Sequence, residues 1–164
     1  MSRPDPLPPL LALVAALGAE GAPGRGFAAL EAAARAMLGV RLFSIMLHDA
    51  EGSWNARVYS NQPEAYPVGG RKPVRDTAWA RQLFTLGEPW LCRDAEEIRA
   101  TFPDHALIAS LGCAAGLNLP VRWQGRTLGT LNLFHQAGWY EAGDLPAGRL
   151  LAGLAVPVLL GGRR

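Results

Sequence analysis

Hydrophobic residues recur at the spacing of an α-helix in several stretches of the chain. In the clearest stretch Phe27, Leu30, Ala34 and Met37 share one helical face, and Gly39 follows where a helix typically ends. The same pattern, read together with capping residues and glycines, predicts the other helices. The predicted helices are residues 10–17, residues 27–38, a segment capped by Asp76 or Thr77 and ended by Gly87, two short segments that begin at Asp94 and Pro103, and a stretch that follows Asp144.

Shorter apolar runs between turn residues predict strands. The predicted strands are residues 40–48, 54–60, 89–92, 113–121 and 127–135. Residues 40–48 are apolar on both faces, which favours the middle of a covered sheet, whereas the proline that opens 89–92 favours an edge. The last two strands form the clearest hairpin, with Gln124 and Gly125 at its turn. Residues 61–73 hold three prolines and two glycines and are expected to be a loop.

The order of these elements indicates the fold class. Helix, hairpin, helices, hairpin and helix follow one another, which predicts an α+β fold. A central antiparallel sheet of about five to six strands would carry helices on both faces. The chain has 164 residues, so one domain is expected. We assign residues 1–26 to an N-terminal helix and linker and residues 27–164 to the domain.

Charge and cysteine content exclude several function classes. The chain has 16 Lys and Arg against 14 Asp and Glu, a net charge of +2, which gives no reason to expect nucleic acid or an anionic membrane as a partner. Two cysteines are too few for a disulfide framework or a four-thiolate zinc site. We therefore expect no metal and no cofactor.

Two apolar stretches near the ends of the chain bear on location. Residues 7–17 resemble a secretory signal, but Asp5, Pro8 and Pro9 argue against that function. Residues 150–160 are too short to span a bilayer. Both stretches are expected to be helices that pack on the domain or on a second copy of it, in a cytoplasmic protein.

A series of short motifs resembles a GAF domain when they are taken in order. The motifs are Phe-Ser-Ile-Met-Leu-His-Asp at 43–49, Gly-Glu-Pro-Trp-Leu at 87–91, Leu-Gly at 111–112, Asn-Leu-Pro-Val at 118–121 and Gly-Thr-Leu-Asn-Leu at 129–133. In GAF domains the last hairpin typically has an aliphatic-Pro-aliphatic triplet, a glycine turn and a Gly-x-Leu-x-Leu strand, as here. The resemblance covers about residues 27–160. It implies a GAF/PAS-like fold and a sensory module, rather than an enzyme, with a ligand between one sheet face and the central helices.

Polar residues inside the apolar strands are the first candidates for ligand contacts. Ser44 shares a strand face with Met46, and Asn118 and Asn132 interrupt the last hairpin. A buried polar group costs about 1–3 kcal/mol when it has no partner. The resemblance places these residues toward the pocket. The alternative is that they bond to neighbouring backbone or to buried water.

Other candidates come from the segment before the central helices and from the helices themselves. Arg71 and Lys72 follow two glycines and are suited to holding an anion, with Tyr59 and Tyr66 as part of a wall or lid; a solvated loop is the alternative. The remaining candidates each have a structural alternative: Trp79 and Trp90 as cavity walls or as core, and His105 as a ligand contact or as an exposed residue.

Enzyme functions require an activated nucleophile, and Cys92 and Cys113 are the candidates. The cysteine positions that the free methionine-(R)-sulfoxide reductases of the GAF family use are not matched here. The Asn-Lys-Phe-Asp-Glu motif of phosphodiesterase cyclic-nucleotide modules is also missing, as is a bilin-binding cysteine.

We therefore expect a module that binds a small metabolite, has a regulatory role in signalling and is not itself catalytic. It would act through a partner or as a homodimer formed by its terminal helices. The alternatives are a dimerisation or scaffold module whose cavity is filled by its own side chains, and a thiol-dependent enzyme of the methionine-sulfoxide-reductase kind.

Overall fold

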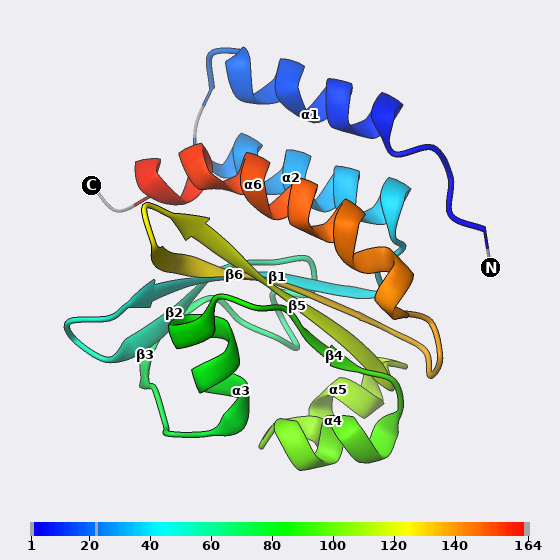
Figure 1. Cartoon of the computed structure of the whole chain (residues 1–164), viewed down its shortest axis with the longest axis vertical. Coiled ribbons are helices and arrows are strands. Elements are labelled where there is room, and N and C mark those ends of the chain that lie inside the picture. The colour runs from blue at the N-terminus through cyan, green and yellow to red at the C-terminus, as the bar shows by residue number, and fades with distance from the viewer. Residues whose placement is uncertain (1, 22, 163–164) are drawn as a thin grey trace.

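The structure, a computed structural model that describes residues 2–21 and 23–162, is built on one six-stranded sheet in the order β3-β2-β1-β6-β5-β4 (Figure 1). All neighbouring strands are antiparallel. The strands are β1 (Leu42–Asp49), β2 (Trp54–Ser60), β3 (Gly69–Pro73), β4 (Trp90–Cys92), β5 (Ala115–Trp123) and β6 (Arg126–His135). The predicted α+β class is confirmed, with β1 in the interior of the sheet and β4 at an edge.

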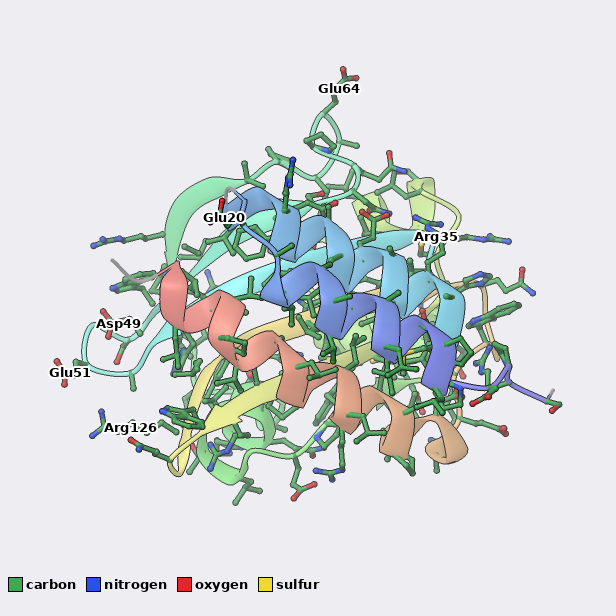
Figure 2. The ribbon with its side chains drawn as sticks, turned by 90° about the horizontal axis from the view of Figure 1, so that it is seen from above. Glu20, Arg35, Asp49, Glu51, Glu64 and Arg126 are labelled. Atoms are coloured by element: carbon green, nitrogen blue, oxygen red, sulfur yellow. The ribbon has the colours of Figure 1, made fainter. Side chains whose placement is uncertain are left out.

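Helices cover both faces of this sheet. They are α1 (Leu7–Gly18), α2 (Pro23–Met37), α3 (Ala78–Ala80), the π-helix η1 (Arg81–Leu86), α4 (Ala95–Thr101), α5 (His105–Ser110), the 3₁₀ turn η2 (Ala142–Asp144) and α6 (Leu145–Gly161). Helices α2 and α6 lie side by side on one face, and α1 forms a further layer over them (Figures 1 and 2). The short helices α3, η1, α4 and α5 lie on the other face.

The face toward α2 and α6 carries the larger hydrophobic core. Phe43 and Ile45 of β1 and Leu131 of β6 are fully buried there, together with the inward side chains of the two helices. Gly129 allows α6 to approach closely, because a Cβ atom on it would lie 2.8 Å from Leu159 Cδ2 and 2.0 Å from the backbone oxygen of Met46. By length and composition alone, residues 142–161 would suffice to cross a membrane, but α6 buries Leu159 and its neighbours on the sheet.

Local capping follows the sequence in two helices. Thr77, rather than Asp76, caps α3, since its Oγ1 accepts a hydrogen bond from the backbone N–H of Ala80 at 3.1 Å. Asp94 Oδ1 accepts bonds from two backbone N–H groups of α4 at 2.9 Å. Side chains that satisfy the free N–H groups of a first turn stabilise the start of a helix.

Three expectations about boundaries and faces are corrected. Helix α2 begins at Pro23, inside the segment that we assigned to the linker. Residues 69–73 form β3, not a loop, because they pair with β2 along its free edge. In the predicted helix that ends at Gly87, the sequence spacing places Trp79, Leu83 and Leu86 on one apolar face. Leu86 is instead 67 % exposed, because residues 81–86 form a wider π-helical turn.

Candidate functional site

Three polar side chains predicted from the sequence lie in one row across the sheet. Ser44 of β1 pairs in register with Asn132 of β6, which pairs with Asn118 of β5. All three are buried. They lie on the face opposite α2 and α6, since their strand neighbours Ile45 and Leu131 point into the core beneath those helices. We call Ser44, Asn132 and Asn118 the polar row.

Hydrogen bonds join the polar row into a chain. Asn132 Nδ2 donates to Ser44 Oγ at 3.3 Å, and Asn118 Nδ2 donates to Asn132 Oδ1 at 2.8 Å. Trp79 Nε1 then donates to Asn118 Oδ1 at 3.0 Å. A primary amide nitrogen carries two N–H groups. These bonds therefore fix the row and, among the described residues, use one of the two N–H donors on each amide.

The helices α3, η1, α4 and α5, which we call the roof, lie on this face of the sheet (Figure 1). Trp79 of α3 packs edge-on against Phe84 of η1 and Phe102 beyond α4, with ring centroids 5.4 and 6.1 Å apart. Phe102 in turn packs on Phe134 of β6 at 5.4 Å. Trp79, Phe84 and Phe102 are half-buried. The roof therefore places an aromatic surface over a hydrogen-bonding one.

A second row, of which only Met46 was a candidate from the sequence, lies two residues further along the strands. Arg57 of β2, Met46 of β1 and Thr130 of β6 pair in register. Among the buried side-chain nitrogen and oxygen atoms of the described residues, Arg57 Nε and Thr130 Oγ1 have no hydrogen-bond partner. A buried polar atom in a native structure usually has one. We call Arg57, Met46 and Thr130 the second row.

Arg57 lies against Tyr66 in the segment before β3. The Arg57 guanidinium carbon is 3.5 Å from the centroid of the Tyr66 ring, and Nη1 donates to the backbone oxygen of Pro67 at 3.0 Å. Burial, and then the carboxylate of Asp104, raise the pKa of Tyr66 well above its usual value. Tyr66 is therefore a neutral phenol at physiological pH. Its role as part of a wall or lid of the pocket stays a prediction.

Three further candidates lie on the same side of the sheet as the roof: Trp90, Met46 and His105. Trp90 of β4 pairs with Asn118 and donates through Nε1 to Thr101 Oγ1 at 3.3 Å. Met46 is half-buried, and His105 is half-buried in the first turn of α5. The structure thus brings Ser44, Met46, Tyr66, Trp79, Trp90, His105, Asn118 and Asn132 to one side of the sheet.

Tyr59, Arg71 and Lys72 do not join these residues. The Tyr59 hydroxyl donates to Glu31 Oε2 of α2 at 2.5 Å, on the opposite face of the sheet. Burial, and then the bond to Glu31, raise the pKa of Tyr59 to about 12. Arg71 stacks on Trp54 at 4.3 Å, and both cations are exposed on the edge strand β3. Arg57, not Arg71 or Lys72, is the cation that lies in the same sheet register as Met46.

The two cysteines are buried and lie at the end of this face. Burial raises the pKa of Cys92 and of Cys113, and hydrogen bonds only partly oppose it. A nucleophilic cysteine needs the opposite, a lowered pKa that populates the thiolate. Within the described chain, no group of three His, Cys, Asp or Glu residues is placed to hold a metal ion.

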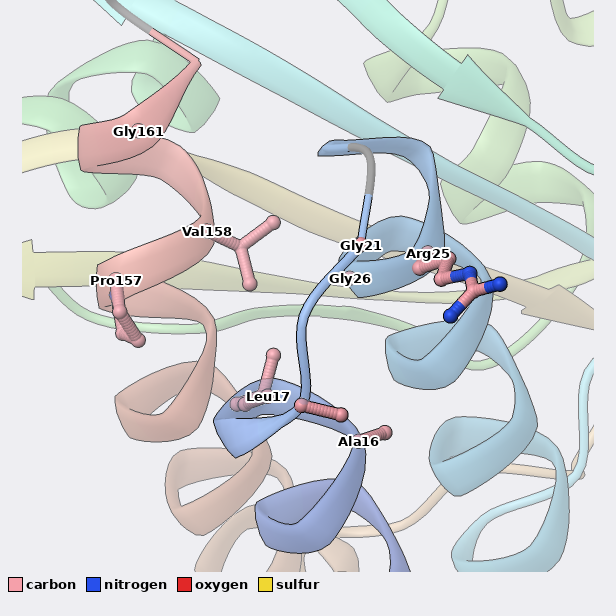
Figure 3. Close-up of a pocket in the computed structure, with 9 residues that line it drawn as sticks. Ala16, Leu17, Gly21, Arg25, Gly26, Pro157, Val158 and Gly161 are labelled. Carbon is pink, nitrogen blue, oxygen red and sulfur yellow. The ribbon is translucent and has the colours of Figure 1, made fainter.

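A surface pocket of about 220 Å³ lies outside this region, in the helical layer (Figure 3). It is formed where the end of α1, the start of α2 and the end of α6 meet, and Leu17, Val158 and Arg25 are among the residues that line it. Arg25 Nη1 already donates to the backbone oxygen of Glu20 at 3.2 Å. The pocket shares no residue with the polar row or the second row.

Comparison with protein-family models gives a match to the family described as GAF domain, over residues 28–160. A search of curated protein sequences gives no match.

Solved structures of low sequence identity share the fold. The GAF domain of an Acinetobacter phosphoenolpyruvate-protein phosphotransferase is 14 % identical with a TM-score of 0.75, over 96 % of this chain and 93 % of that one. The corresponding domain from Coxiella burnetii is 15 % identical with a TM-score of 0.71, over 97 % of each chain. Free methionine-R-sulfoxide reductase from Neisseria meningitidis, solved with its substrate, is 17 % identical with a TM-score of 0.69, over 99 % of this chain and 95 % of that one.

Proposed function

Because this chain belongs to the GAF domain family, we propose that it is a sensory module that binds a small, partly polar molecule between the sheet and the roof. The ligand would lie over the polar row and the second row, with Trp79 and Trp90 as apolar walls. The module would not be catalytic, and its signal would pass to a partner or to a second copy of the chain.

The polar row is the observation that carries this proposal. A core that only needs to be filled is built most simply from apolar residues, since a buried amide must find partners or cost free energy. Here two asparagines and a serine lie side by side in the sheet centre, and their hydrogen bonds leave N–H donors unused. Such an arrangement suits a ligand that accepts hydrogen bonds.

Thermal unfolding in the presence of a metabolite panel tests the proposal. A ligand at 100 times its Kd stabilises the folded protein by about 2.7 kcal/mol and raises Tm in a saturable way. The variant Asn132→Leu removes the centre of the row and should fold but lose this response.

Asn61→Leu is the matched control for that variant. Asn61 bonds to Glu31 and to the backbone of Arg41 and Phe43, away from the roof. Its replacement should lower Tm and leave the response to the metabolite unchanged. If no metabolite shifts Tm, or if Asn132→Leu responds as the parent does, the sensory proposal is wrong.

A dimerisation module is the second candidate function, and one observation favours it. Leu7, Leu11 and Val14 are all more than half exposed and lie on one face of α1. A row of exposed apolar residues on an outer helix is typical of an interface. We propose that a second copy of the chain covers this face, whether or not the site under the roof takes a ligand.

The third alternative, a thiol-dependent reductase, has less support. Both thiols are buried and have raised pKa values. The Neisseria reductase is similar in fold at 17 % identity, and such a likeness carries no information on catalysis.

A further inference from the structure

Thr130 has an unpaired hydroxyl group in the interior of the sheet. It is 0 % exposed, and its hydroxyl has no hydrogen-bond partner among the described residues. Thr127, three residues earlier on the same strand, shows the ordinary arrangement, since its hydroxyl donates to the backbone oxygen of Leu83 at 2.8 Å. A valine would fill the space of Thr130 without the cost of an unpaired hydroxyl. The hydroxyl therefore points to a partner that is not part of the chain.

Arg57 has a buried N–H group without a hydrogen-bond partner in the same region. Within the described chain, the salt bridges of this protein do not include Arg57, and its Nε–H is buried without an acceptor. Its cation rests on the face of Tyr66, which fixes its position without neutralising its charge. A carboxylate is the small group that matches a guanidinium with a free N–H.

The spacing of the two residues limits the ligand. Arg57 and Thr130 pair with the same residue, Met46, from opposite sides, so their backbones are two strand spacings, about 10 Å, apart. Met46 itself is half-buried and apolar. The half-buried ring of Phe84 of η1 stacks on His48, two residues further along β1, with ring centroids 4.0 Å apart. A molecule that lies over Met46 has a charged contact at one end, an apolar middle, and a hydroxyl contact at the other end.

We infer that the ligand class is a short carboxylic acid with a second polar group, a hydroxyl or carbonyl, a few carbons away. Arg57 binds the carboxylate, Met46 and the aromatic rings of the roof contact the carbon chain, and Thr130 binds the second polar group. This inference rests on the proposed function, because it specifies the ligand of the same site.

Three related probes separate the two polar contacts. 4-Oxopentanoate has both groups, pentanoate lacks the carbonyl, and methyl 4-oxopentanoate lacks the charge. We expect 4-oxopentanoate to bind most tightly in calorimetry, with each of the other two weaker by about tenfold or more, as for the loss of one hydrogen bond to a buried or charged group.

Two variants assign each contact to its residue. Thr130→Val should weaken the binding of 4-oxopentanoate to the affinity of pentanoate and leave the affinity for pentanoate itself unchanged. It should also keep or raise Tm without ligand, since no internal hydrogen bond is lost. Arg57→Gln should weaken the binding of both carboxylates by the same factor and leave the affinity for the methyl ester unchanged. Thr127→Val, the control, should lower Tm and keep the order of the three probes, because Thr127 bonds to Leu83 and not to the ligand.

Several outcomes would overturn the inference. If 4-oxopentanoate and its methyl ester bind equally tightly, the proposed carboxylate contact is ruled out. If inorganic phosphate binds as tightly as 4-oxopentanoate, the site is a general anion site. If the Asn132→Leu variant abolishes the response to an uncharged metabolite while Arg57→Gln and Thr130→Val do not, the sensory function stands and the carboxylic acid is wrong. If no probe or metabolite shifts Tm, both proposals fail together.

Discussion

His135 shows how a single side chain can make the stability of this protein depend on pH. Its ring stacks on Trp139 with centroids 3.7 Å apart, and its Nδ1 accepts a bond from the backbone N–H of Gln136 at 2.9 Å. Burial, followed by the positive charges of Arg41 and Arg3, lowers the pKa of His135 to about 4. The folded protein therefore holds this histidine neutral, as the bond from Gln136 also requires.

The free energy of unfolding should fall as pH decreases from about 6.5 to about 4. Over that range the unfolded chain gains a proton on His135 and the folded chain does not, so protonation favours unfolding. Urea unfolding at several pH values measures the effect, and His135→Gln should flatten the curve in this window. A variant with the same slope as the parent would show that His135 is not the cause.

Asp144 provides a check in a separate pH window. Burial alone would raise the pKa of its carboxyl, but two hydrogen bonds from Arg3 at 2.7 and 2.9 Å and one from the backbone of Glu141 outweigh burial and lower it. Its stabilising effect is present above the usual pKa of 3.8 and is lost as pH falls further. Asp144→Asn should therefore remove the change in unfolding free energy below about pH 4, whereas the fall between about pH 6.5 and 4 that comes from His135 should remain.

The sequence predicted the polar row, but of the second row it predicted Met46 and not Arg57 or Thr130, and the difference has a physical reason. Ser44, Asn118 and Asn132 stand out because each interrupts an apolar run. Thr130 is common in strands, and Arg57 lies in a strand with polar neighbours, so neither breaks a pattern. Only the register of three strands brings them to the two sides of Met46.

At the scale of the elements, replacing glycine by alanine is expected to have opposite effects on stability at two positions. A Cβ atom on Gly129 would lie 2.0 Å from the backbone oxygen of Met46, so β1 and β6 would have to separate. On Gly153 of α6, a Cβ atom would meet nothing within 4 Å. The first glycine is required by a close approach of strands and helix, and the second is not.

Gly129→Ala should lower the free energy of unfolding by about 3 kcal/mol, the upper part of the range for overpacking a core. Gly153→Ala should raise it by about 0.5–1 kcal/mol, because alanine restricts the unfolded chain and favours a helix. Chemical unfolding of both variants measures the difference. Equal effects would mean that α6 and β1 do not approach Gly129 as closely as the structure shows.

The long elements could be predicted from the sequence, whereas β3 and η1 could not. Apolar periodicity defines β1, β5, β6 and the face of α2. All five residues of β3 are exposed, and its two glycines have φ values of +92° and +71°, so it has no pattern of its own. It becomes a strand because β2 offers a free edge. In η1, the bond from Gly87 N–H to Gln82 spans five residues and shifts which side chains face the sheet.

At the scale of the whole molecule, the proposed site and the proposed dimer surface lie on opposite faces of one sheet (Figure 1). The connection between them is short. A Cβ atom on Gly129 would meet both the backbone oxygen of Met46 in the second row and the side chain of Leu159 in α6, so β1, β6 and α6 lie close together at this point. Helix α1 in turn lies over α2 and α6 (Figure 2). A ligand that moves β1 by a small amount therefore acts on the layer that carries α1.

We predict that the protein dimerises through α1 and that the ligand changes this equilibrium. Leu11 is 60 % exposed in the centre of the apolar face, so Leu11→Glu should give a monomer in sedimentation at every concentration, because it places a charge in the interface. Val68→Glu, a similar change at an exposed position before β3, should sediment as the parent does.

If 4-oxopentanoate changes the dimer dissociation constant, dimerisation must change the affinity of the protein for 4-oxopentanoate by the same factor, since coupling between two sites is reciprocal. Leu11→Glu should then bind 4-oxopentanoate with the affinity of the parent monomer, independent of protein concentration. A parent protein that sediments as a monomer at all concentrations would leave α1 without this role, and the signal would have to pass to a different protein.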